Sequence, residues 1–327
     1  MKRKITVLTL CAMLFALSYS ASAQQPKKVA RIGYLTAQSA VAEQPRLESF
    51  RQGLRALGHI EGQNIVIEFR HTDGKFERLP DVAAELVRLK VDVLVANTTN
   101  AALAAKNATR TIPIFFIGVS DPVAAGLVDS LARPGGNITG LTNIAPMLAG
   151  KRLELLKETV PKLSRVALMW NPQNPGSVPQ WQESQLPARE LGLQLHSMEV
   201  SSADKYESAF KEAIETRSAA LAVTLDPLAN SNQKRIVGLA TNSRLPAIYA
   251  RGDYVASGGL MSYAPPFAAD GRDTARLVDK ILKGAKPADL PVEQPMKFEF
   301  VINLKAAKQI GLTIPPNVLV RADRVIK

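Results

Sequence analysis

The sequence predicts an α/β fold made of two similar lobes. Short apolar segments alternate with amphipathic helical segments along most of the 327 residues, which is typical of parallel sheets covered by helices. The succession of strand, polar turn, helix and proline-led strand occurs at 91–117 and again at 219–250. A chain of this length is also ample for two hydrophobic cores.

The first half contains five predicted strands, at 29–37, 64–70, 91–99, 112–120 and 137–142. Predicted helices lie between them at 45–58, 78–90 and 100–110. The first helix has Leu47, Phe50 and Leu54 at helical spacing, and Gly58 at its end. Asp121 and Pro122 read as the N-cap and first residue of a further short helix.

The second half repeats the alternation. Predicted strands lie at 164–170, 193–200, 219–227, 245–251 and 258–265, with helices at 151–161, before Gly192, at 204–217 and at 230–244. A further helix at 267–284 and a proline-rich segment at 285–295 follow. We expect residues 24–144 plus about 265–303 to form lobe I, and 145–264 plus about 304–327 to form lobe II.

Residues 1–23 have the features of a cleaved signal peptide. A basic start at 1–4 precedes a short apolar stretch, and Ala-Ser-Ala at 21–23 provides a small-residue cleavage site. The apolar stretch is short for a membrane span, although an N-terminal anchor is the alternative. The sole cysteine, Cys11, lies in this leader. We therefore expect a periplasmic protein with neither a disulfide nor a thiolate metal site.

The formal net charge is +12, from 41 basic and 29 acidic residues. The basic residues are scattered, with no cluster outside the leader and no DNA-binding motif. Together with the predicted export, this distribution favours a solvated basic surface over nucleic-acid binding.

Catalytic and cofactor motifs are absent from the sequence. It has no P-loop, no G-x-G-x-x-G after the first strand, no H-E-x-x-H and no G-x-S-x-G. His59 lies in a turn after a helix, His71 follows an edge-like strand and His196 lies inside a strand, so none of them falls at the predicted cleft. We therefore expect no enzyme activity, no cofactor and no metal. A secreted α/β hydrolase and a ligand-sensing protein for a membrane receptor are the alternatives.

Several segments carry a family resemblance over essentially the whole mature chain. They are "IGYL", "FRQGLRALGHIEGQNIVIEFR", "FIGVSDPVAAGLVDSLARPGGNITGLT", "ELLKETVP", "GGLMSYAP" and "FVINLKAAKQIGLTIPPNVLVRADRVI". The chain resembles ABC-transporter substrate-binding proteins of the tryptophan/tyrosine-binding type. This resemblance implies a type I periplasmic-binding-protein fold, with two Rossmann-like lobes and several crossovers. It also implies capture of a small solute and delivery to an inner-membrane permease.

Candidate ligand contacts follow the predicted strands, where two facing lobes would form a cleft. The first candidates are Thr98, Thr99 and the helix start beyond them, which could bind a carboxylate. Asp226 could meet an ammonium group, or could instead cap the next helix. An amino acid, aromatic or otherwise, or a related small carboxylate is the expected ligand.

The remaining candidates have less specific roles. Gln38 and Asn171 could form hydrogen bonds, and Gly118 and Ser120 could face the ligand. Trp170 and Tyr249 could stack on a planar ligand or pack in the core. Arg251 could bind a second carboxylate or a phosphate, or could be solvated.

Overall fold

The computed structural model describes residues 29–327. The predicted signal peptide at 1–23, with Cys11, lies outside the described residues. Within the described part of the chain, no helix is both long enough and apolar enough to cross a membrane.

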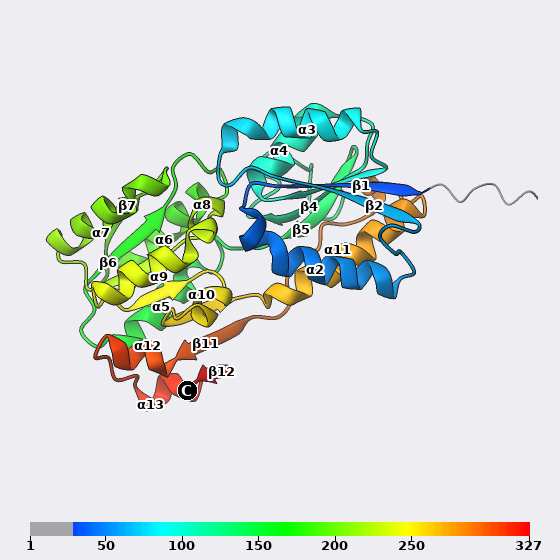
Figure 1. Ribbon diagram of the computed structural model, residues 1–327. Coiled ribbons are helices and arrows are strands. Elements are labelled where there is room, and N and C mark those ends of the chain that lie inside the picture. The colour runs from blue at the N-terminus through cyan, green and yellow to red at the C-terminus, as the bar shows by residue number, and fades with distance from the viewer. Residues whose placement is uncertain (1–28) are drawn as a thin grey trace, which may run out of the picture.

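The first lobe is a five-stranded parallel sheet with helices on both faces (Figure 1). Its strand order is β2-β1-β3-β4-β5. The strands are β1 (Ala30–Thr36), β2 (Ile65–His71), β3 (Val93–Asn97), β4 (Ile114–Val119) and β5 (Ile138–Thr142). Helices α2 (Ala40–Ala56) and α11 (Phe267–Leu282) cover one face, and α3 (Leu79–Arg88) and α4 (Thr99–Ala108) cover the other. A short 3-10 helix, η1 (Phe76–Arg78), precedes α3.

Alternation along β3 shows why the apolar runs form buried strands. Val93 and Val95 pack in the core beneath α2 and α11, whereas Leu94 and Ala96 pack beneath α3 and α4. Successive side chains of a strand point to opposite faces. A strand buried on both faces is therefore apolar at every position.

The second lobe is a seven-stranded sheet of order β12-β11-β10-β9-β8-β6-β7. Its strands are β6 (Arg165–Trp170), β7 (Gln194–Glu199), β8 (Ala220–Val223), β9 (Ala247–Tyr249), β10 (Met261–Ala264), β11 (Glu299–Asn303) and β12 (Arg324–Ile326). Neighbouring strands are parallel except β10 and β11. The lobe therefore keeps the same parallel design and adds an antiparallel step near one edge.

Helices cover both faces of this second sheet (Figure 1). One face packs against α5 (Ala149–Thr159), α6 (Val178–Glu190), α12 (Leu304–Gln309) and α13 (Pro316–Leu319). The other packs against α7 (Tyr206–Glu215), α8 (Pro227–Ser231), α9 (Gln233–Asn242) and α10 (Asp253–Ala256). The 3-10 helix η2 (Ala203–Lys205) leads into α7.

The chain crosses between the lobes three times: between β5 and α5, between β10 and α11, and between the 3-10 helix η3 (Pro287–Asp289) and β11. Buried Arg152 links the first two crossings, because its guanidinium donates to Ala145 O at 3.1 Å and to Tyr263 O at 3.0 Å. Burial lowers the pKa of Arg152 to about 10. The third crossing joins the first where the Thr142 amide donates to Glu293 O at 3.0 Å.

Three expectations need correction. Strand β11 pairs with β10, so the chain returns to the second lobe before Glu299 rather than near residue 303. Helix α2 begins at Ala40 and contains Pro45, because the Ser39 side chain caps it. The segment directly after Asp121 does not form the expected helix. The Asp121 carboxylate accepts from the amides of two following residues, but the segment forms turns and Gly126 adopts φ +66°, a left-handed conformation that interrupts a helix.

Candidate functional site

Two small cavities lie side by side between the lobes. Both are lined by Arg46, Gly118, Asn143, Leu225 and Arg251. The first continues along Leu141, Thr142, Ala250, Gly252, Ala264, Pro265 and Pro295. The second continues along Gln38, Asn97, Thr98, Thr99, Ser120, Asn174, Gly176, Pro227 and Asn230. We call these two cavities together the interlobe cavity.

Six of the ten predicted contacts line this cavity: Gln38, Thr98, Thr99, Gly118, Ser120 and Arg251. They come from the ends of β1, β3, β4 and β9. The rule that ligands bind beyond the carboxyl ends of parallel strands therefore located this part of the wall.

The two predicted aromatic contacts lie elsewhere. Trp170 stacks on Trp181 with ring centroids 5.4 Å apart, and its indole N–H donates to Ser197 Oγ at 2.8 Å. Tyr249 is buried in the second lobe and stacks on Tyr254 at 4.6 Å. Neither ring lines the interlobe cavity, and each stacks on another ring of the protein.

Two polar candidates support the cavity wall from behind. Asp226 caps α8, with Oδ1 accepting from the Ala229 amide at 2.9 Å and Oδ2 accepting from Asn174 Nδ2 at 2.8 Å. Burial raises the pKa of Asp226, although these hydrogen bonds act in the opposite direction. Asn171 orders its own loop, where Oδ1 accepts from the Gln173 amide at 3.0 Å. Neither residue lines the interlobe cavity, and Asp226 has the capping role that was its alternative.

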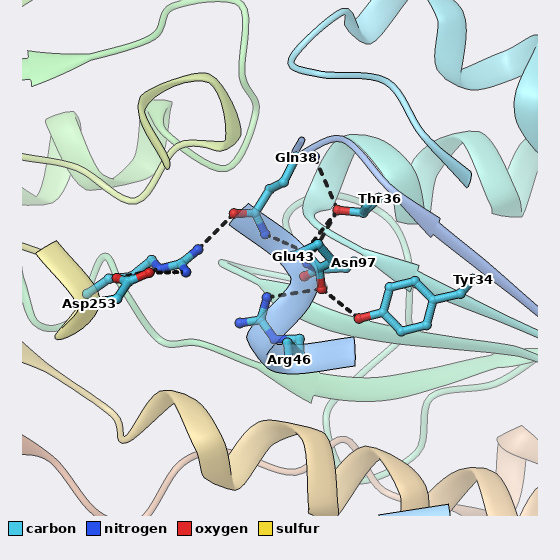
Figure 2. A network of polar contacts seen from close by, with 8 residues as sticks. Tyr34, Thr36, Gln38, Glu43, Arg46, Asn97 and Asp253 are labelled. Atoms are coloured by element: carbon cyan, nitrogen blue, oxygen red, sulfur yellow. Dashed lines mark hydrogen bonds and ion pairs between the residues drawn. The ribbon is translucent and has the colours of Figure 1, made fainter. Parts of the chain in front are cut away.

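A buried carboxylate organises the first-lobe side of the cavity. Glu43 is fully buried on α2 and accepts hydrogen bonds from Tyr34 at 2.7 Å, Gln38 at 2.8 Å and Asn97 at 2.6 Å. Arg46 Nη1 lies 3.6 Å from Glu43 Oε1, and Figure 2 shows this cluster from close by. The donors surrounding the carboxylate offset the cost of burying its charge.

Arg251 extends from the second lobe to the first. Its Nη1 donates to Gln38 Oε1 at 2.7 Å, and its Nε donates to Asp253 Oδ1 at 3.1 Å. Glu43 accepts from the amide nitrogen of Gln38, so the Gln38 oxygen is directed toward Arg251 (Figure 2). A continuous polar chain therefore runs from Glu43 in one lobe to Asp253 in the other.

A second interlobe contact forms around Gly176. The Ser120 hydroxyl donates to Gly176 O at 2.9 Å. A β-carbon added at Gly176 would lie 2.8 Å from Thr99 Oγ1, which is closer than real contacts allow. A side chain at position 176 would therefore crowd Thr99 where the loop after β6 meets the first lobe.

The start of α4 combines backbone strain with an anion-binding geometry. Thr98 has φ 95° and ψ 156°, a region normally occupied by glycine. Its hydroxyl accepts from the Ala101 amide at 3.3 Å and so caps the helix. Thr98 and Thr99 line the cavity at the positive end of the helix dipole. Such an end favours negatively charged groups.

The three histidines lie outside the cavity wall. His59 contacts Asp279 on α11 at 2.7 Å, His71 stacks on Phe69 at 5.6 Å, and His196 lies 3.7 Å from Glu212. In the described residues, no cluster of histidine, cysteine or carboxylate side chains could hold a metal ion.

Several wall residues escaped the sequence reasoning, namely Arg46, Asn97, Asn143, Asn174 and Asn230. Asn97, Asn174 and Asn230 lie at or just after the ends of predicted strands, but other residues near those strand ends were named as candidates. Arg46 lies inside the helix predicted at 45–58, whereas candidates were taken only from residues that follow predicted strands. Ser39, directly after the first strand, was the available signal for an earlier helix start.

The fold and the interlobe cavity together define a two-lobed solute-binding protein. The sequence model of the family described as "ABC transporter substrate binding protein" matches residues 38–326. The chain belongs to this family. It is 29% identical over 278 residues to the tyrosine-binding protein of Clostridioides difficile, covering 84% of this chain and 80% of that relative.

Two solved structures of related proteins are similar to this chain over most of its length. An ABC domain from Streptococcus pneumoniae in complex with L-Trp matches with a TM-score of 0.84 at 29% identity, over 91% of this chain and 99% of that one. A ligand-free, open structure of a substrate binding protein from Clostridium difficile matches with a TM-score of 0.66 at 28% identity, over the same shares. At nearly equal identity, the chain as a whole is structurally more similar to the ligand-bound relative. The direct contacts between the lobes agree with a closed arrangement.

Proposed function

We propose that this protein captures a small carboxylate-bearing solute between its lobes and delivers it to an ABC permease. The observation that carries the proposal is the polar interlobe cavity, whose wall is built from both lobes. A ligand touching both walls binds the closed form better than the open form, so binding drives closure.

The relatives support a carboxylate ligand. One is named for tyrosine, and the structure of another contains L-Trp. The cavity here is compatible with a carboxylate, because the start of α4 and two guanidinium groups, of Arg46 and Arg251, border it. The leader at 1–23 supports export to the periplasm, where such a receptor meets its solute.

Purified protein beginning at Gln24 provides the test. Native mass spectrometry should detect a solute bound at one per chain. After its removal by unfolding and refolding, adding it back should raise the melting temperature and reduce the radius of gyration. Arg235→Gln removes an arginine that pairs with Glu207 on the exposed surface, away from the cavity. It controls for the loss of a positive charge and should bind the solute like the parent. Chemical conversion of the bound solute, or a failure of every solute in a cell extract to bind, would contradict the proposal.

A further inference from the structure

The charged groups at the interlobe cavity are distributed unevenly. Among the described residues that line it, Arg46 and Arg251 are the charged side chains, one from each lobe, and no carboxylate is included. The acids nearest in the network lie behind the guanidinium groups: Glu43 is fully buried beside Arg46, and Asp253 holds Arg251. A ligand therefore meets the cationic side of each ion pair.

Several amide and backbone oxygens of the wall strengthen this bias, because they already accept hydrogen bonds from the protein. Gln38 Oε1 accepts from Arg251, Asn143 Oδ1 from the Ala145 amide, Asn174 Oδ1 from the Gly176 amide, and Asn230 Oδ1 from the Tyr254 hydroxyl. The backbone oxygens of Gly118 and Gly176 accept from side chains in the same way. Each of these bonds occupies one of the two lone pairs of its oxygen, so the wall offers an ammonium group fewer acceptors.

One amide oxygen is placed differently. Asn97 donates through Nδ2 to Glu43, and its Oδ1 lies 3.2 Å from the position that a β-carbon would take at Gly118. A neutral oxygen can accept a hydrogen bond from a ligand hydroxyl or from an ammonium. It does not supply the opposite charge that offsets taking an ammonium out of water.

The apolar part of the wall is aliphatic. Leu141, Leu225, Ala264, Pro265 and Pro295 line it, and no aromatic ring does so among the described residues. The aromatic side chains expected at the strand ends stack on protein rings instead. A compact aliphatic body suits this surface better than an indole or phenol ring that requires a stacking partner.

We infer that the preferred ligand is a small aliphatic carboxylic acid without an ammonium group. Its carboxylate lies between Arg46 and Arg251, and so draws the two lobes together. This inference rests on the proposed function and narrows it, because within the class of small carboxylates it separates the amino acids from their deaminated analogues. Asp226, which was expected to bind an ammonium, is occupied as a helix cap.

The test uses pairs of probes that differ only in the ammonium group: glutarate with glutamate, isocaproate with leucine, and indolepropanoate with tryptophan. Titration calorimetry on refolded protein should show the acid of a pair binding at least ~10-fold more tightly than the amino acid. The reason is that repulsion between the ammonium and a guanidinium weakens the binding free energy of the amino acid by roughly 1.4 kcal/mol or more. The aliphatic pairs should exceed the indole pair in affinity. Tighter binding of any amino acid than of its deaminated partner would overturn the inference.

Variants locate the carboxylate. Arg46→Gln and Arg251→Gln should each weaken binding of the acid by about 30-fold or more, as expected for a buried charge pair, and should narrow the preference for acid over amino acid. Arg235→Gln is again the control. Folding of each variant is checked by its melting temperature without ligand.

The solute that copurifies decides the case if no probe binds. An acid without an ammonium group supports the inference. An amino acid or a neutral solute overturns it and leaves solute capture intact. If no solute of any class binds, the proposed function itself fails.

Discussion

Replacing Glu43 with glutamine should destabilise the first lobe severely. The carboxylate is fully buried, accepts from Tyr34, Gln38 and Asn97, and faces Arg46 at 3.6 Å. Glu43→Gln keeps the shape, but it places an NH₂ group against donors and leaves the Arg46 guanidinium without that carboxylate. Breaking a buried, hydrogen-bonded ion pair costs about 3–5 kcal/mol.

This magnitude predicts a large fall in melting temperature. At roughly 2–4 °C per kcal/mol for a folding unit of about 150–250 residues, the fall is about 6–20 °C. Thermal melting by circular dichroism and urea denaturation measure it. The control is Glu61→Gln, which breaks an exposed pair with Arg51 at 2.8 Å and should cost about 1 kcal/mol or less.

A second variant separates loss of charge balance from loss of shape. Adding Arg46→Met to Glu43→Gln also removes the cation that faces Glu43, so the double variant should be more stable than the sum of the single losses predicts. The carboxylate does not have the organising role assigned to it if the free energy of unfolding of Glu43→Gln lies within about 1 kcal/mol of the parent value. The same holds if the stability losses of the two single variants simply add in the double variant.

Three further predictions concern the cavity wall and its support. Because burial raises the pKa of Asp226, its folded form keeps a proton to higher pH than the unfolded form. The stability of the parent relative to Asp226→Asn should therefore be greatest in acid and decline as pH rises from about 3.9, with solute affinity nearly unchanged; a relative stability that rises with pH would refute this in melts across a pH series. Gly176→Ala should oppose closure by about 1–3 kcal/mol through overpacking against Thr99, and should therefore weaken solute binding. The control Gly238→Ala lies in open space on α9 and should bind the solute with the affinity of the parent. Equal solute affinities of the two variants would contradict the contact between Gly176 and Thr99. Thr98→Gly relieves roughly 1–3 kcal/mol of strain at a small capping cost, whereas Thr98→Val keeps the strain and loses the cap, so in urea denaturation the glycine variant should be the more stable by about 1 kcal/mol or more.

The sequence predicts the strands well, because apolar runs buried on both faces of a parallel sheet depend mainly on local composition. It predicts the cavity less well. Thr98 and Ser120 follow strands directly and were found by position alone. Glu43 and Arg46 were not, because their place depends on how far α2 extends toward its start and on which donors the sheet presents to them.

Residues whose partners come from distant segments were also misjudged. Trp170 and Tyr249 have the chemistry to stack on a ligand, but Trp181 and Tyr254 meet them first. Asp226 could face either a ligand or a helix end, and the amides of α8 decided between them. The path of β11 was misassigned for the same reason, since its partner β10 lies more than thirty residues earlier.

The hydrogen bond between Gln38 and Arg251 joins the two lobes through protein atoms alone. A net stabilisation of about 1.5–3 kcal/mol for a hydrogen bond to a charged group would raise the closed-to-open ratio roughly 10- to 100-fold, whether or not a solute is present. A receptor that presents its closed form to a transporter would then also present unloaded copies, which occupy docking sites without cargo. The strength of this bond and of the Ser120–Gly176 bond sets a trade-off between catching a scarce solute efficiently and keeping idle receptors off the transporter.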